Sequence, residues 1–158
     1  MLSKYENIFG DLPLGRPPNK GVEHAIKLEI GTQIINMQPY RNPKRIQYEI
    51  EEAIKELLEL DLLRPSSSPY ASSVVMVNKK DGILRMCICF RSFNKNTLKN
   101  RYPIPRICEV MDDLHGSYFF SNIELRCGYH QIQMKEEDIP NIAFRCHYGH
   151  FEFVAMSF

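Results

Sequence analysis

Apolar residues recur every three or four positions between residues 43 and 61, the most regular hydrophobic pattern in the chain. Glutamates fill positions between them, so the apolar side chains form one stripe along a helix and the acids lie elsewhere around it. Asn42 followed by Pro43 is typical of an N-cap and a first helical position, and Arg64-Pro65 of a stop beyond the end. The pattern predicts a helix over about residues 43–61 that packs its stripe into the core. The stripe consists of Ile46, Ile50, Ala53, Ile54, Leu57 and Leu58.

Two further runs, 73–77 and 83–90, are rich in β-branched and apolar residues and predict a pair of β-strands. Lys80-Asp81-Gly82 lies between them and is typical of a hairpin turn. Successive side chains of a strand point to opposite faces, so the second run has a mixed face and an apolar face. The mixed face carries Arg85, Cys87 and Cys89, and the apolar face carries Leu84, Met86, Ile88 and Phe90.

The segments on either side of this centre are shorter and are punctuated by proline and glycine. Residues 1–41 begin as an irregular lead-in and then predict strands over 24–30 and 33–37. A serine-rich loop, 66–69, precedes the hairpin, and a polar loop, 92–105, follows it.

The final part of the chain combines both kinds of element, which makes the expected fold α+β. Four elements are predicted there: a helix over 106–114 ended by Gly116, a strand over 119–125, a helical turn over 128–134, and a hairpin over 141–156 around Tyr148-Gly149.

Composition is that of an ordinary globular domain. The chain has 158 residues, 44% of them hydrophobic and 25% charged, which is enough for one modest domain with a core. No apolar run approaches the roughly 18 residues that span a bilayer. The first residues lack the apolar centre of a signal peptide. A non-secreted, intracellular protein without a membrane partner is therefore expected, with nuclear, cytoplasmic and organellar locations all open.

Five cysteines without framework spacing favour reduced thiols over disulfides. A zinc site is an alternative interpretation of some of them. However, Cys87 and Cys89 are two apart in a predicted strand, without the turn that structural zinc sites prefer between paired cysteines. Zinc is therefore the less favoured alternative. The ligands in that alternative would be Cys87, Cys89, Cys146, His147 and His150.

Charge is unevenly distributed, although the net charge is only +1. Between residues 79 and 106 there are eight basic residues and one acid, Asp81. Such segregation suits a protein that lays one face on phosphates, although a solvated basic face is an equally good explanation of the charge alone. The eight are Lys79, Lys80, Arg85, Arg91, Lys95, Lys99, Arg101 and Arg106.

The run 119–132 reads F-F-S-N-I-E-L-R-C-G-Y-H-Q-I, an aromatic strand-like segment that ends on one carboxylate before Gly128. It resembles the F-S-x-I-D-L-x-x-G-Y-H-Q-I segment of reverse transcriptases from gypsy-class LTR retrotransposons. In that family the Asp is the first catalytic carboxylate, and this chain has Glu124 in its place.

Residues 64–106 extend the resemblance with R-P-S-x-S-P-Y-A-S, K-K-D-G, R-x-C, F-R-x-x-N and N-R-Y-P-I-P-R in one order. The likeness begins near residue 5 and runs to Phe158. It implies an α+β fingers subdomain followed by the opening strand of a palm. The expected division is a lead-in over 1–41, fingers over 42–117 and an incomplete palm over 118–158, all within one partial reverse transcriptase domain.

The resemblance also implies roles for individual residues. Arg85 and Lys79 match cations that hold the triphosphate of the incoming nucleotide. The backbone N–H groups of Cys127 and Gly128 would face the same triphosphate. Tyr129 matches the aromatic residue that excludes a ribose 2′-hydroxyl. Core packing is the alternative for Tyr129, and a solvated hairpin tip for the two cations. Mg²⁺ is the implied cofactor, with the Glu124 carboxylate and the Leu125 carbonyl as ligands in an incomplete site. Contacts to the template strand would come from Lys80, Arg91, Asn94, Lys95, Lys99 and Arg101.

Two departures count against activity, and one motif of the family is missing. Cys89 stands where the family has an Asp, and Glu124 where it has the first catalytic Asp. Val110-Met111-Asp112-Asp113 imitates the Y-x-D-D motif but precedes Glu124 in a predicted helix, so these acids are not expected to be catalytic. Y-x-D-D itself is absent from these 158 residues.

The chain is therefore interpreted as a truncated, degenerate fragment that is inactive alone. Its parent enzyme would copy an RNA or DNA template from dNTPs with two Mg²⁺ ions, together with palm, thumb and RNase H regions. The alternative is a non-catalytic module that binds nucleic acid or protein.

Overall fold

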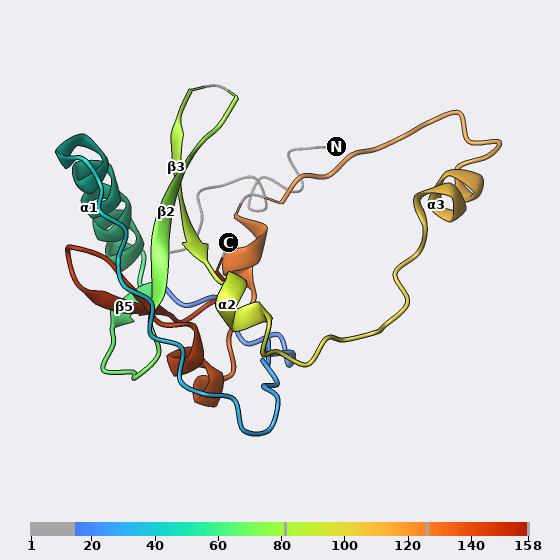
Figure 1. Cartoon of the computed structure of the whole chain (residues 1–158). Helices are drawn as coiled ribbons and strands as arrows, with labels where there is room; N and C mark the ends of the chain where they lie inside the picture. The colour runs from blue at the N-terminus through green and yellow to red at the C-terminus, as the bar shows by residue number, and fades with distance from the viewer. Residues whose placement is uncertain (1–14, 81, 126, 158) are drawn as a thin grey trace.

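The computed structural model describes residues 15–80, 82–125 and 127–157. The expected lead-in over residues 1–14 and Asp81 of the expected turn lie outside these ranges. In the described part of the chain, one sheet of five strands is covered on one side by a long helix (Figure 1). A long excursion between α2 and η2, which carries the short helix α3, extends away from this body.

Helix α1, Lys44–Glu59, confirms the predicted amphipathic helix. Ile50 and Ile54 from its apolar stripe are completely buried. The helix ends because Asp61 adopts the left-handed conformation (φ 52°), which turns the chain toward strand β1, Leu63–Pro65. The expected Asn42 cap is wrong: Pro43 is the N-cap residue, and the Asn42 carbonyl instead accepts a hydrogen bond from the Gln47 side chain at 2.9 Å.

Strands β2, Ser72–Asn78, and β3, Leu84–Cys89, form the predicted hairpin. Gly82 supports the turn with a positive φ of 81°, a conformation that glycine adopts without strain. The two predicted faces of β3 are confirmed, because Ile88 is buried and Met86 packs against the core while Arg85 is exposed.

The C-terminal hairpin is also confirmed, with strands β4, Phe144–Arg145, and β5, His150–Phe153. Its strands enter the middle of the sheet, whose order is β1-β5-β4-β2-β3 in the described chain. Strand β4 runs parallel to β2, and β5 runs antiparallel to β1. The sheet therefore joins residues from both sides of the expected fingers–palm boundary, and the division of the chain into those regions stays a prediction.

Aromatic rings at the centre of this sheet form the core. Phe144 is fully buried, with its ring centroid 6.0 Å from that of Phe151 and 5.5 Å from that of Phe153. Next to them, the 3₁₀ helix η3, Glu136–Ile142, buries Ile139 completely. Helix α1 and β2–β3 thus converge on the C-terminal hairpin.

An ion-pair network fastens the edge of the sheet. Arg64 and Glu152 lie opposite each other on β1 and β5, and Arg64 Nε is 2.8 Å from Glu152 Oε1. Ser66 donates a hydrogen bond to the other carboxylate oxygen at 2.6 Å. The same guanidinium contacts Glu136 at 2.8 Å, and this hydrogen bond lowers the pKa of Glu136. The buried Glu152 carboxylate is therefore paired on both oxygens.

Two predicted strands in the N-terminal region are wrong. Residues 24–30 and 33–37 form only isolated bridges, His24 with Met134, Leu28 with Thr97 and Asn36 with Ala71. Each bridge uses a different partner segment, so no ladder continues along one neighbour. The polar loop over 92–105 likewise contains an unpredicted short helix at its start, α2, Arg91–Asn94, with Phe93 buried.

The strand predicted over 119–125, the expected opening of the palm, is also wrong. Every residue from 98 to 125 is exposed, and we call this segment the exposed arm. It contains the predicted helix, α3 (Ile107–Asp113), but 119–125 pairs with no described residue. A strand needs a neighbour for its backbone hydrogen bonds, and no strand of the described chain pairs with this segment. Phe119 and Ile123 are consequently 96% and 85% exposed.

Candidate functional site

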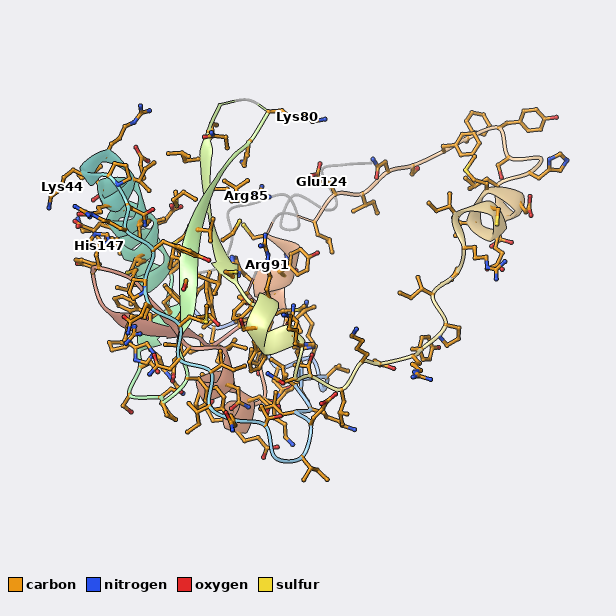
Figure 2. All side chains as sticks on the ribbon, in the orientation of Figure 1. Lys44, Lys80, Arg85, Arg91, Glu124 and His147 are labelled. Atoms are coloured by element: carbon orange, nitrogen blue, oxygen red, sulfur yellow. The ribbon has the colours of Figure 1, made fainter. Side chains whose placement is uncertain are left out.

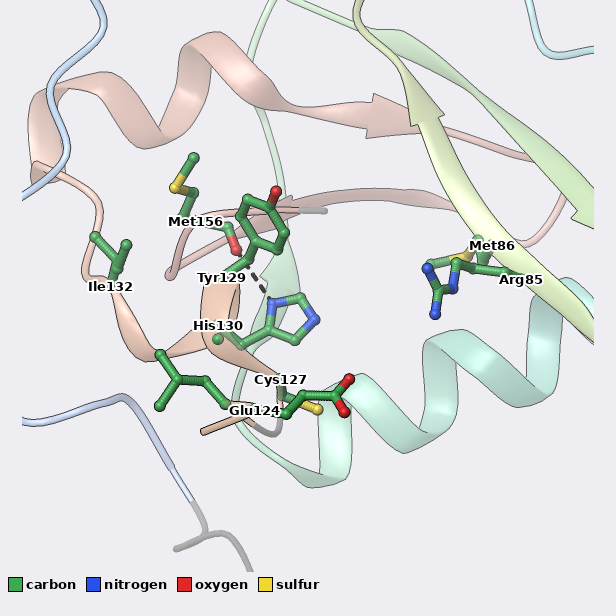
Figure 3. A pocket seen from close by; sticks show the side chains of 10 residues that line it. Arg85, Met86, Glu124, Cys127, Tyr129, His130, Ile132 and Met156 are labelled. Atoms are coloured by element: carbon green, nitrogen blue, oxygen red, sulfur yellow. Dashed lines mark hydrogen bonds between the residues drawn. The ribbon is translucent and has the colours of Figure 1, made fainter. Parts of the chain in front are cut away.

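A cavity of about 1010 Å³ lies where β3 faces the end of the exposed arm and the turn that follows it (Figure 3). One wall is Arg85 and Met86 of β3, and the opposite wall consists of Glu124 and Leu125, residues 127–130, and Ile132. Met156 closes the cavity from the segment after β5. Residues about 40 positions apart in the sequence thus meet at one site. The lining residues are Arg85, Met86, Glu124, Leu125, Cys127, Gly128, Tyr129, His130, Ile132 and Met156.

The wall opposite Arg85 is shaped by a sharp turn. Cys127 has a left-handed backbone (φ 50°), which is uncommon for a residue with a side chain, and the 3₁₀ helix η2, Gly128–Gln131, begins directly after it. Gly128 then lies close to Leu125, since a Cβ at Gly128 would be 3.3 Å from the Leu125 Cβ. The turn therefore needs a small residue at position 128, and it directs Tyr129 and His130 toward the cavity.

The structure brings together most residues that the sequence assigned to nucleotide and metal. Arg85, Glu124, Leu125, Cys127, Gly128 and Tyr129 all line the cavity. Figure 3 shows Arg85 across the cavity from Glu124. The arrangement places a guanidinium, which binds phosphate oxygens in a bidentate manner, on the wall opposite an aromatic ring and a carboxylate. The roles assigned to these residues stay predictions.

Lys79 and Lys80 do not reach the cavity. Both are exposed at the tip of the β2–β3 hairpin, where the Lys79 N–H and C=O bond to Ile83 and Gly82 (Figure 2). Lys79 therefore lies outside the cavity lining, although the register of the hairpin, in which Val77 is opposite Arg85, places Lys79 on the same face as Arg85 and nearer the tip.

The expected template contacts lie outside the cavity on exposed surface. Arg91 and Asn94 belong to α2, and Lys95 follows it. Lys99 and Arg101 lie at the start of the exposed arm. None of these cations, nor Lys80, forms an ion pair with a described residue.

Residues that sequence reasoning left without a role also line the cavity: Met86, His130, Ile132 and Met156. His130 and Ile132 belong to the motif that carries the resemblance, so the motif itself is the signal for them. Met86 and Met156 enter only through the tertiary arrangement of β3 and the C-terminal segment.

The described residues do not make a complete magnesium site. Glu124 contributes one carboxylate, and no group of three or more His, Cys, Asp or Glu side chains in the described chain is arranged to hold a metal ion. Asp112 and Asp113 are the last two residues of α3, in the exposed arm and outside the cavity lining. Mg²⁺ takes near-octahedral oxygen ligands and is commonly held by one or two carboxylates together with waters and substrate phosphates, so Glu124 and the Leu125 carbonyl would form only part of such a site.

The zinc alternative has no geometric support among the described residues. Cys146 is buried in the core, and its burial raises the pKa of the thiol, which disfavours the thiolate that binds zinc. His147 pairs with Glu51 at 2.9 Å, and His150 Nε2 lies 3.0 Å from the Tyr70 carbonyl. These side chains are thus held by other partners rather than gathered with Cys87 and Cys89.

Comparison with known proteins decides the family, although no protein-family model matches the sequence. The retrovirus-related Pol polyprotein of transposon opus from Drosophila melanogaster is 37% identical over 163 residues, covering 96% of this chain and 16% of the polyprotein. The crystal structure of the prototype foamy virus protease-reverse transcriptase matches with a TM-score of 0.79 at 18% identity, covering 98% of this chain and 21% of that protein. The chain is a homologue of the reverse transcriptase region of LTR-retrotransposon Pol polyproteins.

The reverse transcriptase homologue spans less than a quarter of each of these proteins. The foamy viral protease-reverse transcriptase in complex with an RNA/DNA hybrid also matches, with a TM-score of 0.73 at 17% identity, over 98% of this chain and 21% of that protein. The expected α+β reverse transcriptase fold is therefore confirmed. Templated DNA synthesis is the function of this family, which is generally metal-dependent. Among the described residues, no helix combines the length and the hydrophobicity of a membrane-spanning segment.

Proposed function

We propose that the chain forms the fingers side of a reverse transcriptase nucleotide site, and that its cavity receives the incoming deoxynucleoside triphosphate. The observation that carries this proposal is the meeting of Arg85 on β3 with Glu124, Gly128 and Tyr129 across one cavity. A guanidinium binds triphosphate oxygens through charge-assisted hydrogen bonds. The aromatic ring of Tyr129 on the facing wall limits the space available at the sugar.

In this proposal each wall of the cavity has a separate task. Arg85 holds the triphosphate, assisted by the backbone N–H groups of Cys127 and Gly128 on the facing wall. Tyr129 contacts the sugar and excludes a 2′-hydroxyl. Mg²⁺, when held with carboxylates that these 158 residues do not contain, would neutralise phosphate charge near Glu124 and the Leu125 carbonyl. The chain therefore binds nucleotide but does not polymerise by itself.

Equilibrium dialysis with radiolabelled dATP tests the proposal directly. Arg85→Ala should weaken dATP binding by about tenfold to a hundredfold, because hydrogen bonds to charged groups contribute roughly 1.5–3 kcal/mol. Arg91→Ala is the matched control, since Arg91 is an exposed arginine outside the cavity. Equal losses in both variants, or no loss in Arg85→Ala, would contradict the assignment.

A second candidate function is nucleic-acid binding through the basic strip, which we define as Lys79, Lys80, Arg91, Lys95, Lys99 and Arg101. All six cations are exposed, and along the chain they extend from the hairpin tip across α2 to the exposed arm. Figure 2 labels Lys80 at the tip and Arg91 on α2. In the full enzyme we propose that the strip contacts the template strand. Alone, it would bind RNA–DNA hybrids weakly through phosphate charge.

Salt dependence measures this binding. About six phosphate contacts predict a log–log slope of roughly −5 on B-form DNA, at about −0.9 per phosphate. Replacing Lys79, Lys80 and Lys95 with Ala should reduce the slope to about half that value. The triple replacement Lys44→Ala, Lys55→Ala and Lys135→Ala removes the same charge elsewhere and should leave it unchanged. If the control replacement reduced the slope and the Lys79, Lys80 and Lys95 replacement did not, the nucleic acid would bind to another part of the surface and the proposed strip would be wrong.

A further inference from the structure

The turn that carries Tyr129 is tied to the segment after β5 by a short antiparallel pairing. Gln133 and Ala155 form an isolated bridge, the Met134 N–H bonds to the Val154 carbonyl at 3.4 Å, and the Met156 N–H bonds to the Ile132 carbonyl at 2.8 Å. In a regular antiparallel ladder, Ile132 and Met156 would form a hydrogen-bonded pair with two bonds. The second bond would run from the Ile132 N–H to the Met156 carbonyl.

That reciprocal bond is missing, because the Ile132 N–H instead bonds to the Tyr129 carbonyl at 3.1 Å and closes the last turn of η2. The His130 side chain takes its place. His130 Nδ1 lies 3.1 Å from the Met156 carbonyl oxygen (Figure 3). A carbonyl oxygen can only accept, so Nδ1 carries the proton and donates.

A second contact fixes the plane of the same ring. The imidazole stacks on Phe153, with ring centroids 5.8 Å apart and planes 10° from parallel. Phe153 is buried and its ring packs on that of Phe144 in the centre of the core. His130 is thus held at its edge by a hydrogen bond and at its face by the core.

Tyr129 has no comparable burial. It is 48% exposed and stands beside His130 on the cavity wall. Its backbone position depends on η2, a single short turn between the left-handed Cys127 and the pairing at Ile132. His130 joins this turn to the core through both of these contacts.

We propose that His130 is a positioning residue: its Nδ1–H···O=C bond to Met156 and its stack on Phe153 hold the η2 turn so that Tyr129 excludes a 2′-hydroxyl. The inference rests on the proposed nucleotide site and adds a specific cause for its sugar selectivity. His130 acts through Tyr129 and touches no reacting atom.

The test is the ratio of dissociation constants for ATP and dATP, measured by equilibrium dialysis on the 158-residue chain. The unsubstituted chain should prefer dATP by about tenfold or more, and Tyr129→Ala should bring the two constants together. His130→Phe retains a ring for the stack but loses the hydrogen bond, and it should lower the preference by about fivefold with little change in dATP affinity. His130→Asn supplies an amide N–H near the position of Nδ1 and should restore part of the preference.

Control variants separate this inference from the proposed function. His147→Phe changes a histidine that pairs with Glu51 away from the cavity, and it should leave the ratio unchanged. If dATP binding depends on Arg85 but His130→Phe keeps the full preference, the positioning role is wrong and the nucleotide site stands. Equal weakening of ATP and dATP in His130→Phe would show a merely structural role. If the unsubstituted chain binds neither nucleotide, both proposals fail.

A measurement on the unsubstituted chain is independent of variant stability. Long-range ¹H–¹⁵N NMR spectra distinguish the two imidazole tautomers. We expect the Nδ1–H form for His130 at a pH where the ring is neutral. The Nε2–H form would leave no donor toward Met156 and would overturn the inference.

Discussion

Neither the 158-residue chain nor its Glu124→Asp variant is expected to extend a primer on an RNA template. Glu has one methylene more than Asp, so its carboxylate is displaced from the position that the family's Asp would occupy. A displacement of about 1 Å can cost roughly a hundredfold in rate, and Glu124→Asp can regain no more than that. Enzymes typically accelerate reactions by at least about 10⁶-fold over the uncatalysed rate. In phosphoryl transfer, most of this acceleration comes from positioned charge.

The described residues supply only one carboxylate at the cavity, so the larger part of that acceleration is absent in both proteins. The assay is primer extension with Mg²⁺ or Mn²⁺, compared with a mock preparation and with an active reverse transcriptase. Arg85→Ala serves as a further negative control. Template-dependent extension by the chain or by Glu124→Asp that Arg85→Ala abolishes would overturn this prediction.

Limited trypsin digestion should cut the exposed arm at least about a hundredfold faster than the body. Lys99 and Arg101 lie where all residues are exposed and no strand pairing holds the backbone. Lys55 lies inside α1, whose apolar face is buried, so cleavage there requires local unfolding. A difference of about 3 kcal/mol in opening free energy corresponds to roughly a hundredfold in rate.

The two fragments should stay together after the cut. Strand β5 pairs with β1 and β4 pairs with β2, so each fragment contributes to the same sheet and core. Mass spectrometry identifies the cut sites, and gel filtration without denaturant shows whether the fragments co-elute. Replacing Lys99 and Arg101 with Gln should remove the early cuts there without changing cleavage at Lys55. An initial cut at Lys55, or separation of the fragments, would contradict the fold described above.

The local pattern of apolar and polar residues was sufficient to predict those elements in which residues close in sequence are also close in space. Helix α1 follows from apolar residues that recur along one face, and the β2–β3 hairpin follows from two apolar runs around a short turn. Both elements satisfy their main backbone hydrogen bonds internally or with the adjacent strand. Their bounds and their buried faces could therefore be predicted from residues alone.

The errors concern segments whose partners are distant. Residues 24–30 and 119–125 both have strand-like composition, and neither forms a regular strand. Composition specifies that a segment can be extended but not which neighbour pairs with it. The bridge of His24 with Met134 and the exposure of Phe119 are consequences of chain packing that no local window contains.

The candidate site divides in the same way. The sequence alone identified Glu124, Arg85 and Tyr129 as site residues, because they lie in motifs that match the reverse transcriptase family. The family's motif includes His130, but the motif gave no reason for it. The structure supplies the reason: His130 bonds to the carbonyl of Met156, 26 residues later in the chain. That carbonyl lacks its antiparallel partner because the Ile132 N–H bonds to Tyr129 instead.

By itself, the sequence determined the helix, the central hairpin, the α+β class and the family, because these depend on periodicity and on residues read in order. Tertiary structure alone decided that β4 and β5 lie between β1 and β2, that Arg85 faces Glu124 across a cavity while Lys79 does not, and that His130 bonds to Met156. The physical reason is that hydrogen bonds and apolar contacts between distant segments depend on which surfaces meet in the folded chain. Residues that meet in this way are not spaced at a helix or strand period, so no periodic pattern in the sequence reveals them.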